Sequence, residues 1–82
     1  MALQYPLATE KALSLVDREN IIIYVVDMGA TKSLIKKEFE DMFKVKVKGV
    51  NTMRMPDNTK RAYVRLAPEF RASDLAKRLK LV

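Results

Sequence analysis

The feature that most constrains the fold is an uninterrupted apolar run of six residues, from Ile21 to Val26. A strand with one face in water alternates polar and apolar residues, whereas this run has no charged or amide side chain and is mostly β-branched. Such a run predicts a strand that is buried on both faces. We therefore expect it to be the central strand of a sheet with helices on more than one face.

Three segments around this strand are predicted to be helices by their caps and apolar spacing. Thr9 is a typical N-cap for a short first helix that ends near Arg18, and Thr31 can cap the second. Ser73 can cap the third helix. The buried sides are predicted to contain Ala12, Leu13 and Val16 in the first helix, Leu34, Ile35, Phe39, Met42 and Phe43 in the second, and Leu75, Ala76 and Leu79 in the third.

Two further strands are predicted between residues 44 and 66. Lys44, Lys46 and Lys48 alternate with valines, which is typical of a half-buried strand with the lysines on one face. Gly49 interrupts the alternation and indicates a bulge, so the facing of residues 51–55 stays open. The Pro-Asp-Asn-Thr sequence at 56–59 predicts a tight turn. In the strand after it, Ala62, Val64 and Leu66 should point one way and Arg61, Tyr63 and Arg65 the other.

The predicted order of elements is helix, strand, helix, strand, strand, helix. A right-handed crossover through the second helix would give a three-stranded antiparallel sheet in the order 2-3-1. We expect an α+β fold, a small ferredoxin-like sandwich with helices packed on the sheet, forming one domain over residues 1–82. A chain of 82 residues buries only roughly 60–65% of the surface that it exposes when unfolded, so the core must be small.

The composition argues against several classes of function. The chain has no Cys and no His, so it lacks disulfides, thiol nucleophiles, the usual ligands of zinc or haem and the commonest acid–base catalyst. Gly29 and Gly49 are its only glycines, and they form no phosphate-binding loop. No apolar run approaches the roughly 18 residues that cross a bilayer, and the pattern of a signal peptide is missing. We expect no enzyme, catalytic residue, metal, cofactor, small-molecule substrate or membrane insertion, and a cytoplasmic location.

The positive charge is concentrated in one segment. The formal net charge of the chain is +6, and residues 44–65 hold seven Lys and Arg against a single acid, Asp57. This segment therefore carries a charge equal to that of the whole chain, while residues 1–43 are slightly acidic. Such a block on a folded domain is typical of a protein that contacts phosphates. Lysines on strands also keep sheet edges soluble and unpaired, which is the simpler interpretation.

Several side chains in this block are candidates for binding nucleic acid. Arg61 and Arg65 would lie on either side of Tyr63, whose ring can stack on a base or simply cover the edge of the core. The alternating lysines are candidates for phosphate contacts. Asn51 and Thr52 could bond to the RNA backbone, to 2′-hydroxyls or to base edges, or could only satisfy the backbone of a bulge.

Four segments spread over nearly the whole chain carry a recognisable pattern. They are P-L-A-T-E-K (Pro6–Lys11), A-T-K-S-L-I-K (Ala30–Lys36), F-K-V-K-V-K-G-V-N-T (Phe43–Thr52) and K-R-A-Y-V-R-L-A (Lys60–Ala67). Together they resemble the large-subunit ribosomal protein L23 family in its archaeal form. The resemblance implies a structural, RNA-binding protein of the large ribosomal subunit, docked on rRNA beside the exit of the peptide tunnel.

The resemblance also implies partners and site residues. Neighbouring ribosomal proteins and nascent-chain factors such as the signal recognition particle are the implied protein partners. In bacterial members the acid of an [S/T]-E-K motif anchors a ribosome-bound chaperone, and Glu10 occupies that place here. The positions that face rRNA in the family fall on Lys32, Lys36, Asn51, Thr52, Lys60, Arg61 and Arg65. The basic block adds Lys44, Lys46, Lys48, Arg54 and Tyr63 to the predicted rRNA-binding set.

A second interpretation belongs to a different class of protein. A ferredoxin-like domain of this size could be a protein-interaction or regulatory module that uses its sheet surface or an edge strand. Such a module would bind RNA weakly and without specificity, and it would form a defined protein dimer or complex.

Overall fold

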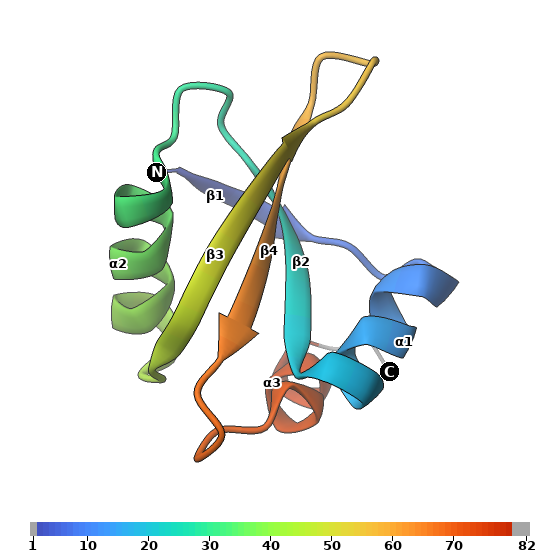
Figure 1. The fold of residues 1–82 in the computed structure, drawn as a ribbon, viewed down its shortest axis with the longest axis vertical. Coiled ribbons are helices and arrows are strands. Elements are labelled where there is room, and N and C mark those ends of the chain that lie inside the picture. The colour runs from blue at the N-terminus through green and yellow to red at the C-terminus, as the bar shows by residue number, and fades with distance from the viewer. Residues whose placement is uncertain (1, 80–82) are drawn as a thin grey trace.

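The computed structural model describes residues 2–79, which form three helices and four strands (Figure 1). In chain order these are β1 (Leu3–Pro6), α1 (Glu10–Glu19), β2 (Ile21–Val26), α2 (Lys32–Phe43), β3 (Val47–Arg54), β4 (Lys60–Leu66) and α3 (Ala72–Arg78). All strand pairs are antiparallel, in the order β1-β2-β4-β3. In Figure 1, α2 lies to the left of the long strands, α1 to the right and α3 near the bottom. The α+β class is as expected.

The central position of β2 confirms the prediction from its composition. β2 lies between β1 and β4, and all six of its residues are buried. Ile22, Tyr24 and Val26 belong to the main hydrophobic cluster, which also contains the buried residues of α2 and α3. Ile21, Ile23 and Val25 alternate with them and therefore point to the other face of the sheet. A strand buried on both sides cannot carry a polar position, which explains its sequence.

The prediction of three strands was wrong, because the sheet has a fourth strand at its edge. β1 pairs with β2 through Leu3, Tyr5 and Pro6, with an irregular register between Leu3 and Tyr5. Four residues that include a proline and a bulge give no period-two pattern. An edge strand tolerates Pro6, which has no N–H to donate. The relative order of the other three strands is as predicted.

Helix α2 supplies the aromatic part of the core. Ile35, Phe39 and Phe43 are buried, and the Phe39 ring lies 4.7 Å from that of Phe43 and 6.1 Å edge-on from that of Tyr24. Burial raises the pKa of the Tyr24 hydroxyl. The predicted stripe was too wide, because Leu34 and Met42 are 45% and 39% exposed. They lie beside the contact with the sheet, where an apolar side chain is only partly covered.

The N-caps of α1 and α2 are as predicted, but that of α3 is not. Thr9 and Thr31 each accept a hydrogen bond from a backbone N–H three residues ahead. Ser73 instead lies inside α3, whose N-cap is Arg71 with no capping side chain. The amide oxygen of Asn20 accepts from the Ala72 N–H at 2.6 Å and takes over this role from 52 residues away.

Asn20 joins three parts of the chain that are distant in sequence. It ends α1 in a left-handed conformation, with φ 59°. Its side-chain amide donates to the carbonyl oxygens of Phe70 at 2.9 Å and Leu66 at 3.2 Å. Its own carbonyl accepts from the Leu66 N–H at 3.1 Å. One residue therefore fixes the end of α1, the end of β4 and the start of α3.

The start of β3 differs from the prediction. Lys44 is not in a strand, because α2 continues to Phe43 and Lys44 is its left-handed C-cap with φ 57°. The carboxylate of Glu40 accepts from the Val47 N–H at 2.8 Å, which links α2 to the first residue of β3. The predicted bulge is present as a register shift between Val47 and Gly49.

Candidate nucleic-acid interface

The hairpin of β3 and β4 presents polar and cationic side chains on the side of the sheet that faces away from the main core. Arg61, Tyr63 and Arg65 alternate with the buried Ala62, Val64 and Leu66. Strand pairing sets Met53 opposite Arg61, Asn51 opposite Tyr63 and Gly49 opposite Arg65. Paired residues point to the same side. We call this set of side chains the hairpin face: Gly49, Asn51, Met53, Arg61, Tyr63 and Arg65.

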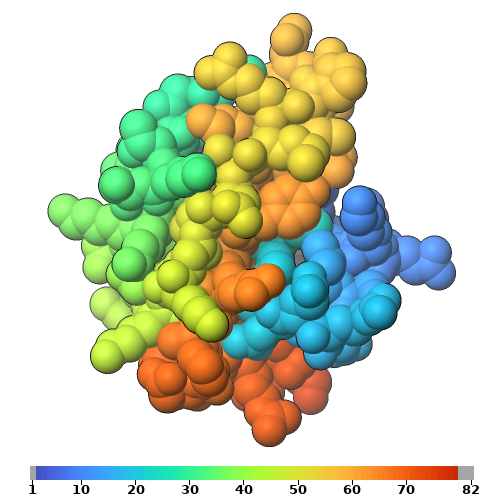
Figure 2. All heavy atoms as spheres, viewed as in Figure 1, coloured from blue at the N-terminus to red at the C-terminus, as the bar shows by residue number. Residues whose placement is uncertain are grey.

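The register answers the question that the bulge left open in the sequence. Asn51 and Met53 lie on the hairpin face and are exposed. Thr52 and Arg54 pair with Ala62 and Lys60 and point to the opposite side. Figure 2 shows side chains of β3 in yellow and of β4 in orange gathered side by side on one surface of the molecule.

The inner strand β2 forms a rigid apolar base for the hairpin face. Ile21, Ile23 and Val25 pair with Arg65, Tyr63 and Arg61, and all three are buried. Arg61 and Tyr63 are themselves half-buried, whereas Arg65 is exposed. Long side chains that cover apolar neighbours keep their polar ends in water, so the phenol and the guanidinium groups are available for binding.

The charged side chains of the strands are all positive. The four strands together contain Lys48, Arg54, Lys60, Arg61 and Arg65 and no Asp or Glu. The one acid between β3 and β4 is Asp57 in the turn, where hydrogen bonds from Thr59 and the charge of Arg61 hold the pKa of the carboxyl below its usual value. All of these cations lie on β3 and β4, so this half of the sheet attracts anions.

The turn itself is ordered by local contacts, as predicted from Pro56–Thr59. The Met55 N–H donates to the Thr59 carbonyl at 2.8 Å, and Asn58 takes a left-handed conformation with φ 63°. The Thr59 hydroxyl donates to Asp57 Oδ1 at 2.6 Å. These contacts fix how β3 leads into β4, and hence the register that builds the hairpin face.

The three alternating lysines do not form the single row that was predicted. Lys44 is the C-cap of α2, Lys46 lies in the loop before β3, and Lys48 is the extra residue near the bulge. A helix end and a bulge both break the period of two. All three side chains are exposed, so they surround the start of β3 as separate charges.

The other predicted rRNA-binding residues, and Glu10, which was predicted to dock protein factors, lie away from the hairpin face. Lys60 donates its ammonium hydrogen to the Ala30 carbonyl at 2.7 Å and is half-buried. Lys32 and Lys36 are exposed on the first turns of α2, and Glu10 is the exposed first residue of α1. The structure thus brings together only part of the predicted set, namely Asn51, Arg61, Tyr63 and Arg65.

Two residues next to this set were missed from the sequence. Tyr5 is 52% exposed and pairs with Val25, in the same row as Arg61, while Met53 is 50% exposed. Tyr5 could be placed only after β1 was known, and Met53 only after the bulge was known. Neither carried a local signal beyond being apolar and close to a proline.

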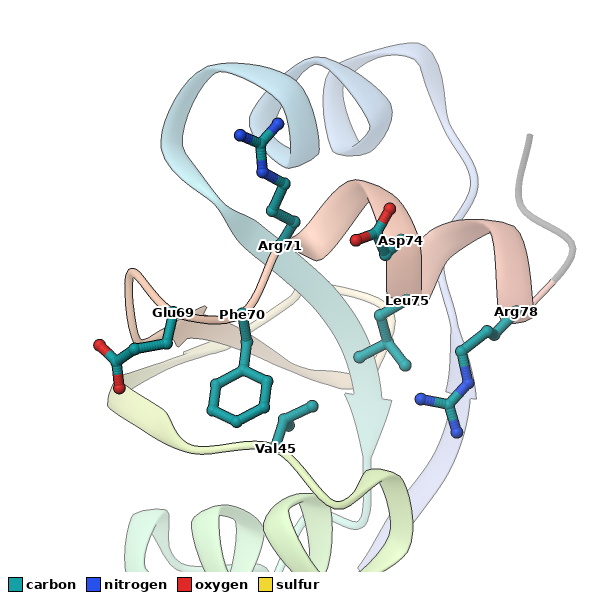
Figure 3. A pocket seen from close by; sticks show the side chains of 7 residues that line it. All are labelled: Val45, Glu69, Phe70, Arg71, Asp74, Leu75 and Arg78. Atoms are coloured by element: carbon teal, nitrogen blue, oxygen red, sulfur yellow. The ribbon is translucent and has the colours of Figure 1, made fainter.

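The cavities described here are hollows open to the surface. One of about 270 Å³ lies at the end of the molecule away from the β3–β4 turn. Figure 3 shows Val45, Phe70 and Leu75 converging there, while Arg71 points away. Within residues 2–79, no cluster of acids could hold a metal ion. Every helix in that range is too short or too polar to cross a bilayer.

Comparison with protein-family models gives a match over nearly the whole chain. The family model described as ribosomal protein L23 matches residues 1–77. This range includes all four strands, the first two helices and α3 up to its penultimate residue. It also includes every residue of the hairpin face.

Proposed function

The chain belongs to the ribosomal protein L23 family, and from this premise we propose that it binds large-subunit rRNA through the hairpin face, beside the exit of the peptide tunnel. Members of this family are constituents of the large ribosomal subunit, so the protein is a ribonucleoprotein component located in the ribosome. Its contribution there is structural, without catalysis. The interpretation as a free regulatory module is correspondingly disfavoured.

One observation carries the proposal. Arg61, Tyr63 and Arg65 share one face of a sheet whose strands contain no acid. Arginine forks onto phosphate oxygens, and a nearby aromatic ring adds a surface for bases. An ordinary solvated strand face mixes both signs of charge, whereas the charged side chains of this one are all cations, which attract the phosphates of RNA.

The remaining predicted residues fit a path of RNA around the edge of the sheet. β3 is an edge strand, so a bound strand can reach both of its sides. Lys44, Lys46 and Lys48 surround its start, and Arg54 lies at its end. We assign these four to phosphate contacts, together with Lys32 and Lys36. Thr52 and Lys60, which are half-buried, would contribute from the side opposite the hairpin face.

Removal of two cations tests the proposal. We expect Arg61→Ala combined with Arg65→Ala to weaken binding to a large-subunit rRNA fragment. If each arginine neutralises one phosphate, the slope of log affinity against log salt should become shallower by about 1.4 to 1.8. The measurement is a salt titration of affinity with the purified protein.

A matched control removes the same charge elsewhere. Lys37→Ala combined with Arg71→Ala takes two exposed cations from α2 and from the start of α3. This variant should keep the slope of the parent protein. Equal slopes for both double variants would overturn the assignment to the hairpin face, because a general loss of charge would then explain the result.

We further propose that Glu10 takes part in docking nascent-chain factors such as the signal recognition particle. The carboxylate is exposed at the first position of α1. Glu10→Gln should lower co-sedimentation of the factor with ribosomes that contain the variant, whereas Asp17→Asn, an exposed acid on the same helix, should not. An equal loss for both variants would contradict a specific role of Glu10.

A further inference from the structure

The hairpin face contains exposed apolar groups that phosphate contacts leave unexplained. Met53 and Tyr5 are each about half exposed, and they lie in one row across the sheet with Val25 and Arg61 between them. Tyr63 is half-buried in the adjacent row. Phosphate oxygens gain nothing from a thioether or a phenyl ring, whereas a base does.

We propose that this surface takes up unpaired nucleotides, with one base stacked on Tyr63 and other bases in contact with Met53 on β3 or Tyr5 on β1. The proposal rests on the proposed function and specifies the form of RNA that the hairpin face recognises. In a duplex the bases are stacked on one another, and proteins reach chiefly phosphates and 2′-hydroxyls. A bulge, loop or single strand exposes the faces of its bases to aromatic side chains.

The spacing of the groups on β4 suits this use. Arg61 and Arg65 each lie two residues from Tyr63 on the same face, which corresponds to about 6.6 Å along a strand. Each guanidinium can therefore hold a phosphate on one side of a base that rests on the ring. The buried Ile23 behind Tyr63 limits how far the ring can turn.

Asn51 adds a group that can read the edge of the base. It is exposed and lies directly opposite Tyr63 on β3. Its amide offers donors and an acceptor at once, which allows two hydrogen bonds to the edge of one base. No hydrogen bond within the described residues uses its side chain, whereas Asn20 uses both ends of its own amide.

Charge favours RNA over a protein as the occupant of this surface. The apolar groups are flanked by Arg61 and Arg65, and no strand of the sheet supplies an acid to balance them. An unpaired RNA segment brings one phosphate with each base, and so it satisfies both parts of the surface. A protein segment would need acids and apolar residues in the same pattern.

The test compares two RNA probes with equal numbers of nucleotides, one unstructured strand and one blunt-ended duplex in which every base is paired. Tyr63→Leu should weaken binding of the unstructured strand by about 5- to 150-fold, the equivalent of one lost stacking contact. It should leave the salt dependence and the affinity for the duplex unchanged. Tyr63→Phe keeps the ring and should bind the unstructured strand as the parent protein does. When the strand contains 2-aminopurine, its fluorescence should change on binding the parent protein and stay unchanged with the Tyr63→Leu variant.

The outcomes separate this inference from the proposed function. If Tyr63→Leu leaves both affinities unchanged while the double arginine variant loses salt dependence, the rRNA interface stands and base stacking is wrong. An equal loss on both probes would also contradict recognition of unpaired bases. If neither probe shows a salt-dependent response to the arginine variant, the proposed function itself fails. Circular dichroism of each variant confirms that the fold is intact.

Discussion

The two faces of the sheet use the same strands in opposite ways. On β4, Ala62, Val64 and Leu66 are almost fully buried against the core, while Arg61, Tyr63 and Arg65 form the hairpin face. The core face has α2 and α3 packed on it, and the hairpin face has an apolar base only on β2. Alternate residues of the same strand therefore have different roles: one set stabilises the fold and the other set is available for binding. Substitutions on one face should change the free energy of unfolding, and substitutions on the other should change the affinity for RNA.

The largest effect on stability should come from the centre of the core face. Phe39 is fully buried and its ring contacts those of Tyr24 and Phe43. Phe39→Ala should lower the free energy of unfolding by about 3–5 kcal/mol, because it removes buried area and leaves a cavity. Urea unfolding followed by circular dichroism measures the change. A loss below about 1 kcal/mol would contradict a core centred on this ring.

The next effect should come from Asn20, which connects the core face to α3. Asn20→Ala removes bonds to Phe70, Leu66 and Ala72 and leaves buried backbone groups without partners, so we expect a loss of about 2–3 kcal/mol. Asn58 is the matched control, since it is also left-handed but lies in an exposed turn. Asn58→Ala should cost only the strain of its backbone, about 1 kcal/mol. Similar losses for both would mean that the side-chain bonds of Asn20 contribute little.

The hydrogen bonds of Asn20 also explain why the N-cap of α3 was predicted wrongly from the sequence. The caps at Thr9 and Thr31, the turn at 56–59 and the strand from Ile21 to Val26 depend on neighbouring residues, and each was predicted correctly. The start of α3 depends on a residue 52 positions away. No local pattern reports such a contact, so Ser73 was chosen in its place.

In the candidate site too, the features that depend on neighbouring residues were predictable, and those that depend on distant contacts were not. Alternation on β4 is enough to place Arg61, Tyr63 and Arg65 together. The facing of Asn51 and Met53 depends on a bulge, whose exact position shifts every later residue to the other side. Tyr5 reaches the same surface only through the pairing of β1 with β2. The charged part of the interface is thus local in sequence, and its apolar part is a product of the fold.

A third prediction concerns the pH dependence of the free energy of unfolding, which Tyr24 on the core face should change. Burial raises the pKa of Tyr24 above its ordinary value of 10.0, so the folded state holds the proton more tightly than the unfolded state. The stability that this provides is complete below pH 10 and is lost as the pH rises toward the folded pKa. Tyr24→Phe cannot ionise and should lose less stability over that range. Parallel urea titrations of both proteins at increasing pH measure the difference, and identical profiles would contradict it.

The smallest effect on stability should come from the hairpin face. Arg65 is exposed and lies between Ile21 on β2 and Gly49 on β3, and Gly49 offers no side chain to pack against. Arg65→Ala should change the free energy of unfolding by no more than about 0.5 kcal/mol. The same variant should bind an rRNA fragment more weakly, with a salt slope shallower by about 0.7 to 0.9. A variant that unfolds more easily but keeps its RNA affinity would break the division between the two faces, because it would make Arg65 a structural residue. Lys37→Ala, which removes an exposed cation from α2, should change neither quantity.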